Sequence, residues 1–375
     1  MRHSRIKIPS PAAYHITSRI KNDDFLLEDD EDKRDLLGII RRTAEFAGIV
    51  VMSHSILDNH FHLLVHIPAR QDVNDAELER RIRILWGDEN AEDKFGRWKF
   101  WESHGKAELA EKERNAFRRR MFDITPFVKT IKELFMHSYH RRHETSGAVW
   151  GASRYKSAAV VSEFKTLATV SAYIDLNAVR ARIARHPKNY KWCSLGAAKK
   201  GDSLASGGIA AMSLTSNRGG EWSRMANGEA AVEEYSRFLD ETRVPKKYGD
   251  SPISKSNSGI AHNQNLSVQN VKRHSAGYVR KTLDSADLTR LGADGVARWL
   301  AESELKPESM SEMWTRRFGN FTLGGIIGPL AAVITVREEL RRGAYMCSRW
   351  QPSVVGEIYS FIHERNAIAR KRNIS

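Results

Sequence analysis

The sequence Leu57-Asp58-Asn59-His60-Phe61-His62-Leu63-Leu64-Val65-His66-Ile67 contains a short polar turn followed by an apolar run that ends at Pro68. Asp and Asn favour turns because their short side chains bond to the nearby backbone. The run before the turn, 49–57, is also apolar and rich in β-branched residues, so both runs predict β-strands. Two strands joined by a tight Asp58-Asn59 turn predict an antiparallel hairpin.

The second strand of this hairpin carries two histidines on one face. Successive side chains of a strand alternate between its faces, so His60 and His62 point the same way and Phe61 points into the core. Two neighbouring imidazoles can hold one divalent cation. The alternative is a pair of ordinary histidines on an exposed sheet face, and the spacing alone does not choose between them.

A second pattern lies in a predicted helix at 163–184. Tyr173 and Asn177 are four residues apart, which makes them neighbours on one helical face. The tyrosine hydroxyl is a potential nucleophile and the amide oxygen is a neutral ligand. The alternative is a helix in which both side chains only tie down the neighbouring backbone, and the spacing by itself favours that alternative.

Periodicity predicts further elements around these two patterns. We expect a strand at 13–18, helices at 29–48, 127–142 and 229–241, a strand at 158–161, and a Gly/Ser/Ala-rich loop with little core potential at 196–228. A highly charged helical insertion is expected at about 69–122. We divide the chain into a domain at 1–245, a flexible linker at 246–270, and a mostly helical basic domain of unknown role at 271–375.

Composition predicts a protein that binds a polyanion. The 375 residues include 60 Lys and Arg against 46 Asp and Glu, a net charge of +14. Neutralised phosphates release condensed counterions, so nucleic acid is the obvious partner, and a basic surface that serves only solubility is the alternative.

The two cysteines exclude a disulfide framework and a cysteine-based zinc site. No run reaches the length of a membrane span, and no apolar signal core follows the basic N-terminus, so we expect a cytoplasmic protein without a membrane partner.

Several segments, taken in order, resemble a known family. They are Ala13-Tyr14-His15-Ile16-Thr17-Ser18-Arg19, 57–65, Trp150 with Arg154-Tyr155-Lys156-Ser157, Tyr173-Ile174-Asp175-Leu176-Asn177-Ala178-Val179-Arg180-Ala181, and 187–192. Together they are similar to the single-tyrosine transposases of the HUH superfamily, which are insertion-sequence-200-like, and most of all to the REP-associated tyrosine transposase branch. The resemblance runs from about residue 11 to 195 and is broken by the charged segment 69–120.

The chain also departs from that family's pattern. The family usually has Pro where Ala178 stands, Met-Pro where Leu57-Asp58 stands, Phe where Tyr155 stands and Asn where His140 stands. None of these differences removes a group that the resemblance makes catalytic. Asp58 adds a negative charge beside the histidine pair.

The resemblance implies an α+β fold, a ferredoxin-like antiparallel sheet with packed helices of the HUH nuclease type. It implies that Tyr173 is the nucleophile and that His60, His62 and Asn177 bind Mg²⁺ or Mn²⁺. The activity would be that of a metal-dependent tyrosine transposase, which cleaves hairpin-associated single-stranded DNA through a 5′-phosphotyrosine and rejoins it. Neither the DNA target nor the oligomeric state, monomer or homodimer, follows from the sequence.

Basic residues of the same segments are candidate DNA contacts. We assign this role to Arg19, Arg118, Arg119, Arg120, Lys129, Lys132, Arg154, Lys156 and Arg180. Trp98 and Trp101 are candidates for stacking on bases, with a local core of the insertion as the equal alternative.

Two other functions remain open at this point. One is a protein that binds hairpin DNA without cutting it, and the other is a metal-dependent hydrolase in which Tyr173 is structural. Tyr155 and Tyr190 are the competing candidates for the nucleophile. Covalent attachment of the protein to DNA would separate these alternatives.

Overall fold

The computed structural model describes residues 8, 10–151, 155–214 and 228–242, together with short pieces between 283 and 363. The expected linker at 246–270 and most of 271–375 lie outside the described residues. Within the described residues, no helix has the length and apolar character that would let it cross a membrane.

A mixed α+β architecture is confirmed, and it is built on one sheet. The first four strands lie in the spatial order β2-β3-β1-β4, and each pairs antiparallel with its neighbour. They are β1 (Ala12–Arg19), β2 (Val50–Leu57), β3 (His60–Ile67) and β4 (Lys156–Val160). The expected hairpin is present as β2 and β3, and Leu57 pairs with His60 across the turn.

The sheet continues beyond β4 with strands from the C-terminal part of the chain, in the order β6, β8, β7, β5. They are β5 (Leu283–Asp284), β6 (Ile326–Gly328), β7 (Arg349–Val355) and β8 (Ile358–His363). β6 pairs parallel to β4. The helical pattern of 271–375 did not predict these strands, because pairing with an open sheet edge overrides local propensity.

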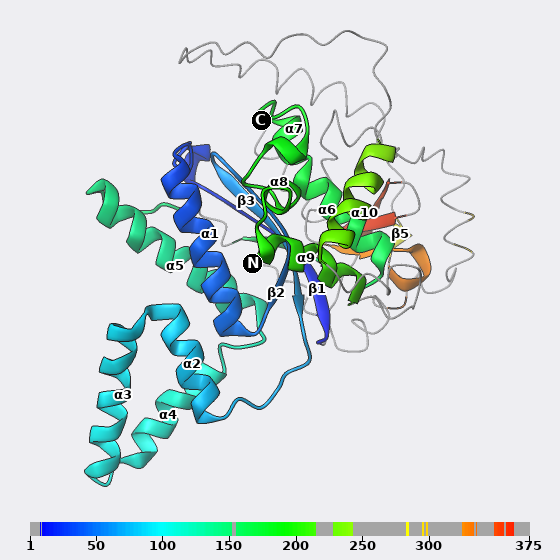
Figure 1. Cartoon of the computed structure of the whole chain (residues 1–375). Helices are drawn as coiled ribbons and strands as arrows, with labels where there is room; N and C mark the ends of the chain where they lie inside the picture. The colour runs from blue at the N-terminus through cyan, green and yellow to red at the C-terminus, as the bar shows by residue number, and fades with distance from the viewer. Residues whose placement is uncertain are drawn as a thin grey trace.

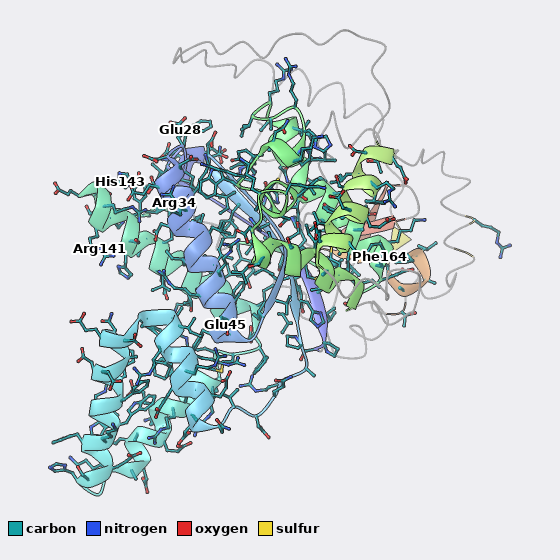
Figure 2. The ribbon with its side chains drawn as sticks, viewed as in Figure 1. Glu28, Arg34, Glu45, Arg141, His143 and Phe164 are labelled. Atoms are coloured by element: carbon teal, nitrogen blue, oxygen red, sulfur yellow. The ribbon has the colours of Figure 1, made fainter. Side chains whose placement is uncertain are left out.

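Helices cover both faces of the first four strands (Figure 1). One layer holds α1 (Asp30–Ala47) and α5 (Ile124–His143), and the other holds α6 (Phe164–Asp175), α9 (Ser203–Leu214) and α10 (Gly228–Glu241). Alternation along β3 sends Phe61 into the first core and Leu64 into the second. Charged side chains of the first layer, such as Arg34, Glu45 and Arg141, lie on its outer surface (Figure 2).

Local signals set the limits of α1. The side chain of Asp29 accepts a hydrogen bond from the backbone N–H of Glu31 at 2.8 Å, which caps the first turn. Gly48 ends the helix in the left-handed region with φ 65°, where a side chain would be strained.

The charged insertion is helical, as expected, and projects from the sheet as three helices between β3 and α5 (Figure 1). They are α2 (Asp75–Trp86), α3 (Asp88–Ser103) and α4 (Ala107–Arg118). Trp98 is 1% exposed and donates a hydrogen bond from Nε1 to Glu113 at 2.7 Å. Of the two alternatives for Trp98, the local core is therefore the one realised, because this indole belongs to the core of the insertion.

Two helical predictions need correction. The helix expected at 163–184 ends at Asp175, and a short helix, α7 (Asn177–Arg180), follows Leu176. The loop expected at 196–228 instead contains α8 (Ser194–Ala198) and α9. Small residues let α9 approach β2 closely, since a Cβ on Gly208 would lie 2.4 Å from the carbonyl oxygen of Val51.

Candidate active site

The two histidines of β3 lie on the sheet face that α6 covers. His60 is 4% exposed, His62 is 5% exposed, and the centroids of their rings are 5.0 Å apart. The expectation that they share a face is confirmed. The alternative of an exposed pair is excluded, because both rings are buried.

Side chains hold one nitrogen of each imidazole. Nδ1 of His60 lies 2.6 Å from Oδ1 of Asn59. Nδ1 of His62 lies 2.8 Å from Oγ1 of Thr17 and 3.0 Å from Nε2 of His15. The remaining nitrogen of each ring, Nε2, is therefore the atom that a metal ion could use.

His15 is a component of the site that the sequence did not reveal. It is 1% exposed, and its ring lies nearly parallel to that of His62 with 5.2 Å between centroids. Burial lowers the pKa of His15 to about 3, so its imidazole is neutral at neutral pH.

Tyr173 of α6 packs against the histidine cluster, which consists of His15, His60 and His62. Its ring is 2% exposed and lies edge-on to the rings of His62 at 6.3 Å and His15 at 6.1 Å. The guanidinium of Arg180 lies 4.4 Å from the centre of the Tyr173 ring and donates a hydrogen bond to the Tyr173 carbonyl. Tyr173, the candidate nucleophile, thus contacts both the histidine cluster and the positively charged side chain of Arg180.

Asn177 caps the end of α6. Its Nδ2 donates to the carbonyl oxygens of Tyr173 and Ile174, each at 3.1 Å. Its Oδ1 is buried and has no hydrogen-bond partner among the described residues. Nδ2 of Asn177 therefore ties down the backbone, as the alternative interpretation expected. Oδ1 of the same side chain is an acceptor that a cation could use.

The described residues contain no group of three or more His, Cys, Asp or Glu side chains placed to hold a metal ion. The donors expected from the sequence are of a different kind, two imidazole nitrogens and one amide oxygen. Asp58 does not add to this set, because Lys33 pairs with its carboxylate at 2.6 Å.

The competing tyrosines occupy structural positions. Tyr190 donates a hydrogen bond from its hydroxyl to the carbonyl oxygen of Ile56 at 2.7 Å, and burial raises its pKa far above the ordinary value. Tyr155 packs in the core on the other side of the sheet, with its hydroxyl 3.4 Å from Oγ1 of Thr125. Of these three tyrosines, Tyr173 is the one whose ring meets the histidines.

A buried carboxylate holds the C-terminal end of α6. Asp175 accepts hydrogen bonds from the hydroxyl of Tyr235 at 2.9 Å and from the backbone N–H of Ser194 at 3.0 Å. Burial raises the pKa of Asp175 to about 7. Oγ of Ser194 lies 2.9 Å from Nδ1 of His54, so β2, α6, α8 and α10 meet in one polar network.

Basic residues border the polar face of the sheet. Arg19 pairs opposite His60 and forms an ion pair with Asp23 at 2.9 Å. Lys156 is exposed and pairs opposite Thr17, which places it on the same face. Arg154 lies outside the described residues.

The arginines of the insertion differ from one another in their surroundings. Arg118 forms ion pairs with Asp75 and Glu111. Arg120 donates to Oγ1 of Thr130 at 2.9 Å and lies over aromatic rings. Arg119 is exposed. Partners within the protein favour a structural role for Arg118 and Arg120.

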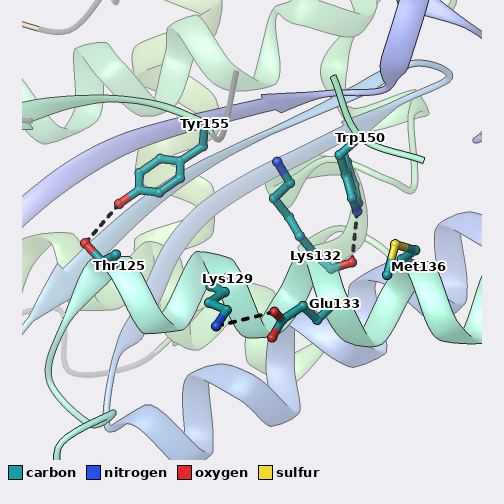
Figure 3. Close-up of a pocket in the computed structure, with 7 residues that line it drawn as sticks. All are labelled: Thr125, Lys129, Lys132, Glu133, Met136, Trp150 and Tyr155. Carbon is teal, nitrogen blue, oxygen red and sulfur yellow. Dashed lines mark hydrogen bonds and ion pairs between the residues drawn. The ribbon is translucent and has the colours of Figure 1, made fainter. Parts of the chain in front are cut away.

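Lys129 and Lys132 border a cavity of about 400 Å³ on α5 (Figure 3). The cavity is lined by Thr125, Lys129, Lys132, Glu133, Met136, Trp150 and Tyr155. Trp150 and Tyr155 belong to the core that α1 and α5 form, whereas Tyr173 belongs to the other core. The cavity therefore lies on the opposite side of the sheet from the histidines.

Comparison with known proteins yields little by sequence. No protein-family model and no curated protein matches the chain. Among solved structures, the REP-associated tyrosine transposase bound to a REP hairpin is similar with a TM-score of 0.34 and 13% identity, over 52% of this chain and 82% of that one. A similarity of this size does not assign a function, so the proposal depends on the residues of the site.

Proposed function

We propose that this protein is a metal-dependent DNA endonuclease and strand transferase of the single-tyrosine HUH transposase type. Its substrate is hairpin-associated single-stranded DNA, Tyr173 is the nucleophile, and His60, His62 and Asn177 hold Mg²⁺ or Mn²⁺. The observation that carries the proposal is the position of Tyr173, whose ring lies edge-on to His62 at 6.3 Å within a buried polar layer.

A ferredoxin-like core of the HUH nuclease type is part of this proposal. The chain order β1, α1, β2, β3, α5, β4 supports it, with the insertion between β3 and α5. The spatial order β2-β3-β1-β4 with antiparallel neighbours supports it as well.

The donor atoms, two imidazole nitrogens and one amide oxygen, suit a divalent cation that also binds substrate phosphate. His60 and His62 would bind through Nε2, and Asn177 through its buried Oδ1, which has no hydrogen-bond partner among the described residues. Amide oxygens, water and phosphate oxygens are ligands that Mg²⁺ and Mn²⁺ prefer. When bound, the cation would neutralise the non-bridging oxygens of the phosphodiester and polarise its phosphorus.

The reaction balances with the groups present. Oη of Tyr173 forms a bond to phosphorus as the bond from phosphorus to the 3′ oxygen breaks. The phenolic proton lost by Tyr173 is balanced by the proton gained by the new 3′-hydroxyl. The 5′-phosphotyrosine retains the energy of the phosphodiester bond, so attack by a 3′-hydroxyl rejoins DNA without ATP.

The DNA contacts closest to the chemistry are those that share its face. Arg19, Lys156 and Arg180 have this position, and we include Arg154 because it precedes β4. Lys129, Lys132 and Arg119 would bind phosphates further from the reacting bond.

Covalent capture tests the proposal. The full chain is incubated with Mn²⁺ and a labelled pool of DNA hairpins with random single-stranded flanks, then separated by denaturing electrophoresis. We expect an adduct with the wild type and with Tyr155→Phe, and none with Tyr173→Phe. The Tyr173→Phe change deletes one hydroxyl and should lower the free energy of unfolding by about 1 kcal/mol.

Each other outcome overturns the proposal in a distinct way. An adduct that persists in Tyr173→Phe identifies a different nucleophile. Cleavage without an adduct identifies a hydrolase. Hairpin binding with neither cleavage nor adduct identifies a DNA-binding protein without this chemistry.

A further inference from the structure

The nitrogen that faces away from the proposed cation has a side-chain partner in both histidines. Asn59 contacts Nδ1 of His60 at 2.6 Å, while Thr17 and His15 contact Nδ1 of His62 at 2.8 and 3.0 Å. The oxygen of Asn59 can only accept a hydrogen bond. It therefore requires a proton on Nδ1 of His60 and leaves the lone pair on Nε2.

The same logic applies to His62, where two partners share one nitrogen. A hydroxyl oxygen and a neutral imidazole nitrogen can both accept a hydrogen bond, so either can accept the one donated by Nδ1–H of His62. A partner that orients the ring in this way also raises the basicity of the nitrogen that binds the metal.

We propose that His15 and Thr17 are positioning residues that hold His62 with Nε2 available to the cation. This inference rests on the proposed function, because it concerns the same metal site. It adds a pair of residues on β1 that act through His62 and do not bind the cation themselves.

The strand register explains why both residues reach one ring. Thr17 pairs directly opposite His62 across β1 and β3, and His15 lies two residues before Thr17 on the same face. The rings of His15 and His62 lie nearly parallel, at an interplanar angle of 14°, with their nitrogens 3.0 Å apart, so His15 contacts the edge of His62 at Nδ1. His15 also meets the edge of Tyr173 at 6.1 Å, so a smaller residue there would open space beside the phenol.

Metal affinity measures this role without activity. The full chain is titrated with Mn²⁺, and free Mn²⁺ is followed by electron paramagnetic resonance. We expect Thr17→Val combined with His15→Phe to weaken Mn²⁺ binding by about 10- to 100-fold, the loss typical of residues that orient a metal-binding histidine. We expect each single variant to have a smaller effect, and Thr17→Ser to restore wild-type affinity.

Thr43→Val is the matched control. Thr43 is fully buried in α1, outside the histidine cluster, and its hydroxyl has no hydrogen-bond partner among the described residues. Its replacement makes the same chemical change and should leave Mn²⁺ affinity unchanged. Thermal unfolding of every variant shows whether the chain is folded. If the double variant does not fold, the Mn²⁺ affinities of Thr17→Val and Thr17→Ser are compared instead, and equal affinities would contradict a positioning role for Thr17.

The outcomes separate this inference from the proposed function. If His60→Ala and His62→Ala bind Mn²⁺ as the wild type does, the metal site itself is wrong. If those two variants lose Mn²⁺ while the double variant on β1 binds it normally, His15 and Thr17 have no positioning role. Equal losses in Thr43→Val would also overturn the inference, because the effect would then be one of stability.

Discussion

The two faces of β1 and β3 are built from alternate residues of the same segments, and only one of them carries a cluster of buried polar side chains. On the face toward α1 and α5, Ile16, Phe61 and Val65 are apolar and fully buried. On the face toward α6, His15 and His62 are almost as deeply buried but polar. Buried polar groups cost free energy unless they find partners, and these histidines find them in one another and in Thr17. Both faces bury an apolar core, and we assign the chemistry to the one that also carries this polar cluster.

The largest expected effect is on the polar face. His60→Ala and His62→Ala should each abolish cleavage of hairpin-bearing single-stranded DNA, because two ligands from one strand hold the cation only together. DNA binding should stay largely intact, because the basic residues that bind DNA are independent of the two histidines. Cleavage and electrophoretic mobility shift are measured side by side, with and without a chelator. Cleavage that survives in either variant, or in chelator, would remove the metal from the mechanism.

The residue between these two histidines should behave in the opposite way. Phe61 is 0% exposed and packs edge-on to Trp150 at 5.7 Å. Phe61→Ala should lower the free energy of unfolding by about 3–5 kcal/mol, since it leaves a cavity in the core. Denaturant unfolding measures the loss. Mn²⁺ affinity of the folded fraction should stay at the wild-type value, and a parallel fall in affinity would show that the two faces are not independent.

A pH effect on stability comes from His54, another buried histidine outside the apolar core. Burial lowers its pKa to about 4 from an ordinary value of 6.5. Between these two values the unfolded chain binds a proton that the folded chain excludes, so stability falls as the pH falls from 6.5 to 4. The full difference corresponds to about 3 kcal/mol.

The raised pKa of Asp175 acts in the opposite direction, because it makes stability rise as the pH falls. Comparing the wild type with His54→Gln isolates the His54 effect, because both proteins contain Asp175. We expect the wild type to lose about 3 kcal/mol relative to His54→Gln as the pH falls from 6.5 to 4. Denaturant unfolding at several pH values measures the difference. A difference between the two proteins that does not change with pH would contradict the prediction.

The smallest effect concerns an exposed charge at the edge of the polar face. Arg19→Ala should weaken hairpin binding and reduce the slope of log affinity against log salt by about 1, because one phosphate contact is lost. Arg118→Ala is the control, since Arg118 lies in the insertion and not on the polar face, and it pairs with both Asp75 and Glu111. Equal slopes for Arg19→Ala and the wild type would place Arg19 outside the DNA interface.

Much of the fold near the site follows from local signals. The Asp58-Asn59 turn and the alternation after it predicted the hairpin, the shared face of His60 and His62, and the burial of Phe61. These features depend on neighbours in sequence, and the two-residue period of a strand is enough to place them. The nearness of Tyr173 to Asn177 is local as well, and it survives the break at Leu176.

The features that were missed depend on contacts between distant segments. His15 approaches His62 from 47 positions away in the chain, and no periodicity relates them. The close approach of Gly208 to Val51 lets a stretch with the composition of a loop pack against β2 as a helix. The partnership of Trp98 with Glu113 likewise decided between the two alternatives that the sequence left open for this residue, base stacking and a local core.

The sequence by itself therefore determined which residues share a face, because side-chain direction along a strand or helix is a matter of backbone geometry. Only the tertiary structure decided what each face meets. The pairing of β1 with β3 places Thr17 opposite His62, and the packing of α6 over that pair brings Tyr173 to it. Such meetings depend on how whole elements bury their surfaces against one another, which no local pattern encodes.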